Sequence, residues 1–145
     1  MEDVHLAIGI SVLVSNLVAG GWGAVAWLRQ RPSVAFWYLL RVAQATVVLQ
    51  VAAGTILLLS GREASDGLHY VYGLLPLLVT LLAEGARAGA AERELTGLDF
   101  ESLPKARQHL IAMAIVRRET GIMAVSALIV LFLALRAVGT SGGLF

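Results

Sequence analysis

Four long apolar runs, separated by short polar segments, dominate the chain. They cover roughly residues 4–28, 36–60, 68–83 and 121–138. A helix that crosses a bilayer needs about 20 predominantly apolar residues, and the runs reach or approach that length. The break after the first run, Arg29-Gln30-Arg31-Pro32, combines charge with a proline that ends a helix. The pattern predicts an all-α polytopic membrane protein, with four transmembrane helices in an up-down bundle and a single domain over residues 1–145.

The connection 88–120 is the only sizeable segment that we expect outside the membrane. Gly97-Leu98-Asp99-Phe100 reads as a turn, and Ser102 is a candidate N-cap with Pro104 just inside the helix start. Apolar residues then recur at helical spacing, with charged residues between them. This predicts an inner amphipathic helix that lies on the membrane surface or runs straight into the fourth span.

Composition supports a membrane setting. Hydrophobic residues make up 58% of the chain and charged residues only 14%, against about 25% charged in soluble domains. The net charge of +1 gives no attraction to nucleic acid, and the lack of cysteine excludes disulfides and thiolate chemistry. Glu2 and Asp3 replace the basic start of a signal peptide, so the first run is expected to be retained. Richness in Ala, Gly, Leu, Val and Arg suggests a GC-rich bacterial genome and hence the bacterial plasma membrane.

The basic residues predict the orientation. Most Lys and Arg residues lie in the first loop or the 88–120 connection, and only Arg62 and Arg136 fall on the opposite side. Cytoplasmic segments carry an excess of Lys and Arg. We therefore expect the 88–120 connection inside, both termini outside, and the first and third spans running in the same direction.

Two histidines should lie at the same depth near the outer face. His5 and His69 each fall within about the first turn of parallel spans, the first and the third. Ionisable residues inside a membrane usually have a function or a partner, and haem iron accepts two axial ligands such as histidines. They are therefore candidate metal ligands for a haem b. The plainer alternative is that they bridge to water and lipid headgroups at the interface.

Other polar residues share this level. Arg62 and Arg136 could pair with haem propionates, because a planar guanidinium suits a carboxylate. Tyr70 could add a hydroxyl donor. With the histidines, these residues form the predicted cofactor-binding set.

One motif consists of Gln50-x-x-x-Gly54, a short loop, and then Leu68-His69. With this motif, roughly residues 2–80 of the chain resemble one four-helix half of haem A synthase and related membrane b-type cytochromes. The resemblance implies that His5 and His69 are axial ligands, with Glu2, three residues before His5, beside the site. That family has two four-helix halves and a second histidine pair, which this chain lacks. The resemblance therefore implies a single haem and not a two-haem hydroxylating mechanism.

A second constellation is expected at the inner ends of the spans. Glu84 could pair with Arg41 or Arg117, or with Arg87 along its own helix. This predicted inner polar cluster comprises Arg41, Gln44, Glu84, Arg87, Arg117 and Glu119. Its functional interpretation is a proton, anion or quinone head-group site, and its structural interpretation is an anchor that fixes helix order and depth.

The leading hypothesis is a small integral membrane b-type haem protein that serves in electron transfer or haem handling. Its expected partner is a membrane redox protein or a larger respiratory complex, and we assign no catalytic residue. The alternative is a cofactor-free accessory subunit of a larger membrane complex. Small-residue motifs motivate it, namely Asn16-x-x-x-Gly20, Ala19-x-x-x-Gly23 and Gly85-x-x-x-Gly89. Such motifs allow close helix contact within the bundle or between copies, so a homo-oligomer stays open. The absence of an inverted repeat disfavours a transporter.

Overall fold

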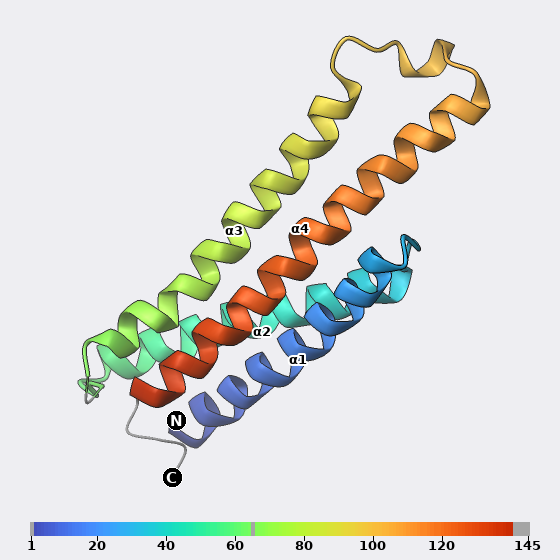
Figure 1. Cartoon of the computed structure of the whole chain (residues 1–145). Helices are drawn as coiled ribbons and strands as arrows, with labels where there is room; N and C mark the ends of the chain where they lie inside the picture. The colour runs from blue at the N-terminus through green and yellow to red at the C-terminus, as the bar shows by residue number, and fades with distance from the viewer. Residues whose placement is uncertain (1, 65, 141–145) are drawn as a thin grey trace.

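The computed structural model describes residues 2–64 and 66–140, without the side chain of Glu2. Within these residues the fold is all-helical and contains no strand. The helices are α1 (Glu2–Leu28), α2 (Val34–Leu59), α3 (Leu68–Leu95) and α4 (Lys105–Thr140), with a short 3₁₀ turn, η1 (Phe100–Ser102). Successive helices run in opposite directions (Figure 1). The predicted all-α class and the four long helices are confirmed.

We call the end of the bundle that carries the α1–α2 loop the loop end, and the opposite end, where α1 begins, the histidine end. At the loop end, α1 closes with two bonds of a Schellman motif. Arg31 N donates to Ala26 O at 3.0 Å and Gln30 N donates to Trp27 O at 3.1 Å. Gln30 takes the left-handed conformation that this cap requires, with φ of 54°. The tight cap turns the chain directly toward α2.

The core is concentrated at the loop end and the middle of the bundle. α4 packs along both α1 and α3, and α1 also packs along α2, whereas α2 and α3 meet at few places. The buried loop-end cluster contains Phe36, Leu40, Ala83, Met123, Ala124 and Ala127. A second cluster of Val12, Val47 and Val130 lies toward the middle. The central position of α4 thus holds the two halves of the chain together.

Glycines permit this close packing. A Cβ at Gly20 would lie 2.7 Å from Leu128 Cδ2, and one at Gly121 would lie 2.7 Å from the Trp27 indole nitrogen. Small residues at these positions therefore serve contacts inside the bundle. By contrast, a Cβ added at Gly85 or Gly89 would meet no atom of another helix or side chain within 4 Å.

The outward faces of the helices are apolar. Each of the four helices is long and apolar enough to cross a membrane, judged by length and composition. Large apolar side chains point away from the core on every helix, for example Leu17 at 56%, Leu49 at 56%, Leu82 at 64% and Phe132 at 66% exposure. In water such a surface would be costly, whereas lipid tails would cover it without penalty.

The predicted amphipathic segment is not a separate helix. α4 begins at Lys105 and runs without a break through the fourth apolar run, which is the second of the two alternatives. α3 likewise continues past the predicted limit of residue 83 to Leu95, because its alanine, glutamate and arginine residues favour helix even where hydropathy falls. Together α3 and α4 project beyond the α1–α2 loop as a helical hairpin (Figure 1). We call residues 88–120 the arm.

The turn of the arm differs from the expected N-cap. Ser102 ends η1, and its hydroxyl donates to Asp99 O at 2.8 Å instead of capping α4. α4 starts after Pro104. The Gln108 amide explains the difference, because it donates to Phe100 O at 3.0 Å and so holds the turn from inside the helix. Gly97 takes a positive φ of 74°, as the predicted turn requires.

Candidate functional site

Two imidazoles meet at the histidine end. His5 lies in the first turns of α1 and His69 in the first turn of α3. Because α1 and α3 run in the same direction, both side chains reach the same level of the bundle. Their ring centroids lie 6.2 Å apart, with the ring planes inclined at 59°. The geometry brings together the two residues that the sequence placed at one depth.

Each imidazole is held from behind by another helix. The His69 Nδ1–H donates to Ala137 O on α4 at 3.1 Å. The His5 Nε2 lies 3.1 Å from the Gln50 side-chain nitrogen on α2. Histidines that bind metals usually use the second ring nitrogen in this way, so that the first is oriented toward the metal. All four helices therefore contribute to the position of the pair.

Gln50 is a site residue that the sequence reasoning did not assign. It was recognised only as part of the Gln50-x-x-x-Gly54 motif. The sequence feature that could have identified Gln50 is its position, because it is a polar amide within the apolar run of α2. It lies one turn from Gly54 on the same face of the helix. A Cβ at Gly54 would lie 3.3 Å from His5 Cε1, and one at Gly9 would lie 3.2 Å from the Gln50 amide nitrogen. The two glycines thus let α1 and α2 approach closely around these side chains.

Two buried polar atoms at this site have no hydrogen-bond partner in the described structure. They are His5 Nδ1 and Gln50 Oε1. An unpaired buried polar atom costs about 1–3 kcal/mol. If the Gln50 amide is turned over, its Oε1 accepts from the His5 Nε2–H at the same 3.1 Å separation. In that orientation His5 Nδ1 carries the lone pair, as an imidazole that binds a metal does, while the Gln50 amide nitrogen takes the position of Oε1 and also lacks a partner in the described structure.

The other predicted residues at this end take different roles. The Tyr70 hydroxyl accepts a hydrogen bond from Ala64 N at 2.8 Å, and its ring lies 6.4 Å from that of His69. The Arg136 guanidinium stacks over the Tyr72 ring at 5.6 Å. Arg62 lies in the α2–α3 loop, where its backbone N donates to Leu57 O at 3.1 Å. The side chain of Glu2 lies outside the described residues.

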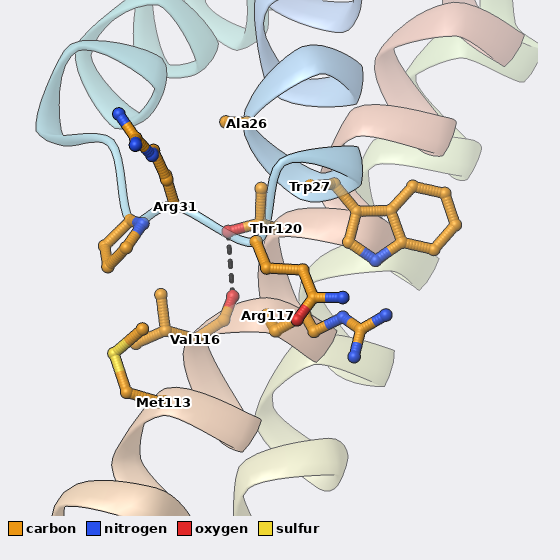
Figure 2. Close-up of a pocket in the computed structure, with 9 residues that line it drawn as sticks. Ala26, Trp27, Arg31, Met113, Val116, Arg117 and Thr120 are labelled. Atoms are coloured by element: carbon orange, nitrogen blue, oxygen red, sulfur yellow. Dashed lines mark hydrogen bonds between the residues drawn. The ribbon is translucent and has the colours of Figure 1, made fainter.

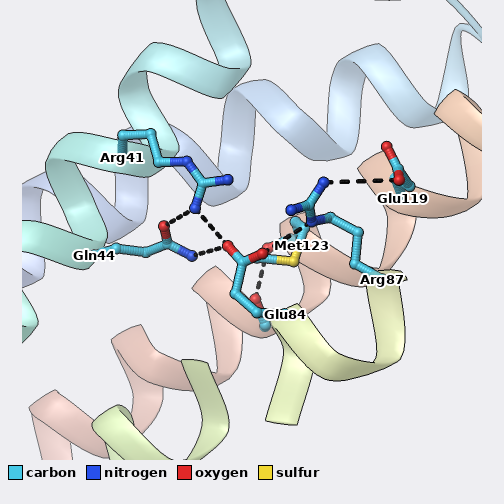
Figure 3. Close-up of polar contacts among 7 residues, drawn as sticks. Arg41, Gln44, Glu84, Arg87, Glu119 and Met123 are labelled. Carbon is cyan, nitrogen blue, oxygen red and sulfur yellow. Dashed lines mark hydrogen bonds and ion pairs between the residues drawn. The ribbon is translucent and has the colours of Figure 1, made fainter. Parts of the chain in front are cut away.

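The predicted inner polar cluster is built around one carboxylate (Figure 3). Glu84 Oε1 accepts from Arg41 Nη1 at 2.5 Å and from Gln44 Nε2 at 2.8 Å, and its Oε2 accepts from Arg87 Nε at 2.9 Å. Arg87 also approaches Glu119 at 3.7 Å and lies 5.6 Å from the centre of the Trp37 ring. Glu84 therefore accepts from three donors on α2 and α3, and Arg87 extends the cluster to α4 through Glu119.

Arg117 does not join this cluster. Of the three expected partners of Glu84, Arg41 and Arg87 contact it, whereas Arg117 lies beside Trp27 at the end of α1 (Figure 2). The neighbouring Arg118 forms an ion pair with Glu94 at 2.6 Å. Because every polar group of Glu84 is engaged by the protein, the geometry favours the anchor interpretation of the cluster over a site for an exchangeable ligand.

No protein-family model, curated protein or solved structure matches this chain.

Proposed function

We propose that the chain is a small integral membrane protein that binds one b-type haem between His5 and His69 and serves in electron transfer or haem handling. The carrying observation is the separation of the two imidazoles. A metal held by two imidazole nitrogens at about 2 Å each places the ring centres about 6 Å apart. The centroid distance in this structure is 6.2 Å.

The residues present fit this group. His5 Nδ1 has no hydrogen-bond partner among the described residues, and His69 donates its Nδ1–H to Ala137 O. Within the described residues, no three His, Cys, Asp or Glu side chains come together that could hold a metal ion. A metal bound by two protein ligands needs further donors, and a porphyrin provides four nitrogens in its plane. The donor set therefore favours haem over a bare ion.

When bound, haem iron would supply reversible one-electron chemistry, tuned by its axial ligands and by the hydrogen bonds behind them. The role of this chain is to orient the imidazoles. Gln50 and the Ala137 carbonyl hold the ligand rings, and the glycines Gly9 and Gly54 bring α1 and α2 together around them. Arg136 and Arg62 are proposed to pair with the propionates from the histidine end.

The test is an absorption spectrum of the purified protein in detergent, before and after haem addition. We expect a Soret band that shifts on reduction, and its loss in His5→Ala and in His69→Ala. The matched control is His109→Ala, since His109 is exposed on the arm and should leave the spectrum unchanged. A protein that stays colourless after haem addition would refute the proposal.

The second candidate is a cofactor-free accessory subunit of a larger membrane complex. Gly85 and Gly89 favour it, because this small-residue face is open in the chain while the faces of Gly20 and Gly23 are filled. A helix of another subunit could pack there. Co-purification from native membrane distinguishes the two candidates, and a colourless chain that migrates alone counts against both.

A further inference from the structure

At the loop end, where the arm leaves the bundle, the structure contains a hollow of about 350 Å³. Its lining residues come from the last turn of α1, from α3 and from α4: Trp27, Glu94, Ala114, Arg117 and Arg118. A second, much smaller hollow adjoins it and shares Trp27 and Arg117 with it. The pair of hollows lies at the opposite end of the bundle from the histidines.

The larger hollow carries an uncompensated positive charge. Its one carboxylate, Glu94, already pairs with Arg118 at 2.6 Å. Arg117 is exposed and forms no ion pair with any residue of the described structure. Arg31 adds a further guanidinium on the wall of the smaller hollow, which contains no acid. An anion is therefore the ligand that this charge would attract.

Trp27 gives the hollow an aromatic wall. A Cβ at Gly121 would lie 2.7 Å from the indole nitrogen, so the ring packs directly on the backbone of α4. Figure 2 shows the Arg117 guanidinium below the Trp27 ring. Tryptophan with arginine at the end of an apolar helix is typical of the headgroup level of a bilayer. The hollow thus combines a cation with an aromatic ring at the point where the apolar part of α1 ends.

We propose that this hollow binds the phosphate of an anionic phospholipid, with the Arg117 guanidinium as the principal contact and Trp27 as the flanking ring. The planar guanidinium matches two phosphate oxygens, and basic pockets between membrane helices bind anionic headgroups. The inference rests on the membrane setting of the proposed function and is independent of haem. Loss of the lipid site would leave the haem spectrum unchanged.

The experiment is native mass spectrometry of the full chain, released from nanodiscs that contain phosphatidylglycerol, phosphatidylcholine or both. We expect the wild type to retain phosphatidylglycerol in preference to phosphatidylcholine. Arg117→Gln should retain it about fivefold less, the factor that corresponds to one lost basic contact near an anionic surface. Arg107→Gln is the matched control, because it removes the same charge from an exposed position of α4 outside the hollow.

Addition of inorganic phosphate separates the two sources of the anion. If phosphate does not displace the lipid, the headgroup with its glycerol backbone is the ligand; displacement shows that the hollow recognises the phosphate group itself. Equal retention of the two lipids by the wild type would overturn the proposal, whatever the folding state of the variants. Equal loss in Arg117→Gln and Arg107→Gln would overturn it as well, since the effect would then be one of overall charge.

Discussion

Gly23 offers a direct test of the packing between α1, α2 and α4. A Cβ at this position would lie 2.8 Å from Phe36 Cδ2 and 2.9 Å from the Cβ of Ala124. Phe36 is fully buried and Ala124 is 1% exposed, so neither can move aside into open space. Extra methylene groups in a well-packed core cost about 1–3 kcal/mol. Gly23→Ala should therefore lower the free energy of unfolding despite the higher helix propensity of alanine.

The matched control is Gly21→Ala. Gly21 lies on the same helix, two positions away, and a Cβ there would meet nothing within 4 Å. The propensity gain of up to about 1 kcal/mol is common to both variants, so the difference between them isolates the steric cost. Unfolding in mixed detergent and SDS, followed by circular dichroism, should place Gly23→Ala about 1–3 kcal/mol below Gly21→Ala. Equal stability of the two variants would refute the packing described for α1.

Two further pairs of variants test the polar sites. Glu84→Gln should lower the free energy of unfolding by about 1–3 kcal/mol, because Arg41 and Arg87 lose their shared carboxylate in a partly buried place. Glu119→Gln is the control, because it removes the same charge from a single 3.7 Å contact, and it should cost under about 1 kcal/mol. If Glu84→Gln and Glu119→Gln lower the free energy of unfolding equally in the same assay, the central role of Glu84 is contradicted. Gln50→Leu should weaken haem binding about 10–100-fold through loss of the contact that orients His5. Gln50→Glu should restore part of that affinity in a spectroscopic titration, and unchanged affinity in Gln50→Leu would argue against this role.

The shared level of His5 and His69 could be predicted from the sequence because it depends only on topology. Once four apolar runs alternate in direction, residues near the starts of the first and third runs must share a level. The hydrogen-bond partner of each imidazole could not be predicted from topology. The bond from His69 to Ala137 O uses a backbone carbonyl, and any residue of α4 at that level offers one. Only the rotation of the helices decides which carbonyl is reached.

The length of the helices in the arm could not be read from hydropathy. The apolar signal of the third run fades near Ala83, and the expected membrane span stopped there. Helix propensity does not fade, and α3 continues to Leu95. The partner of Glu84 was equally open in the sequence, because Arg41 and Arg117 lie at similar depth. The packing of Trp27 on Gly121 turns Arg117 toward the end of α1, and this contact has no signature in the pattern of charges.

In the proposed membrane setting, the arm lies on one side of the bilayer, so a reagent that cannot cross the membrane reaches it from that side alone. From Gly121, beside the end of α1, back to Lys105, α4 extends about 24 Å at 1.5 Å per residue. The turn of the arm, with Gly97 at its start, is therefore held well clear of the apolar bundle. A protease added to sealed vesicles would reach this turn only in molecules whose arm faces it. Since α4 packs on α1 as well as α3, the cleaved fragments should remain associated, so a single cut would report the orientation of an otherwise intact bundle.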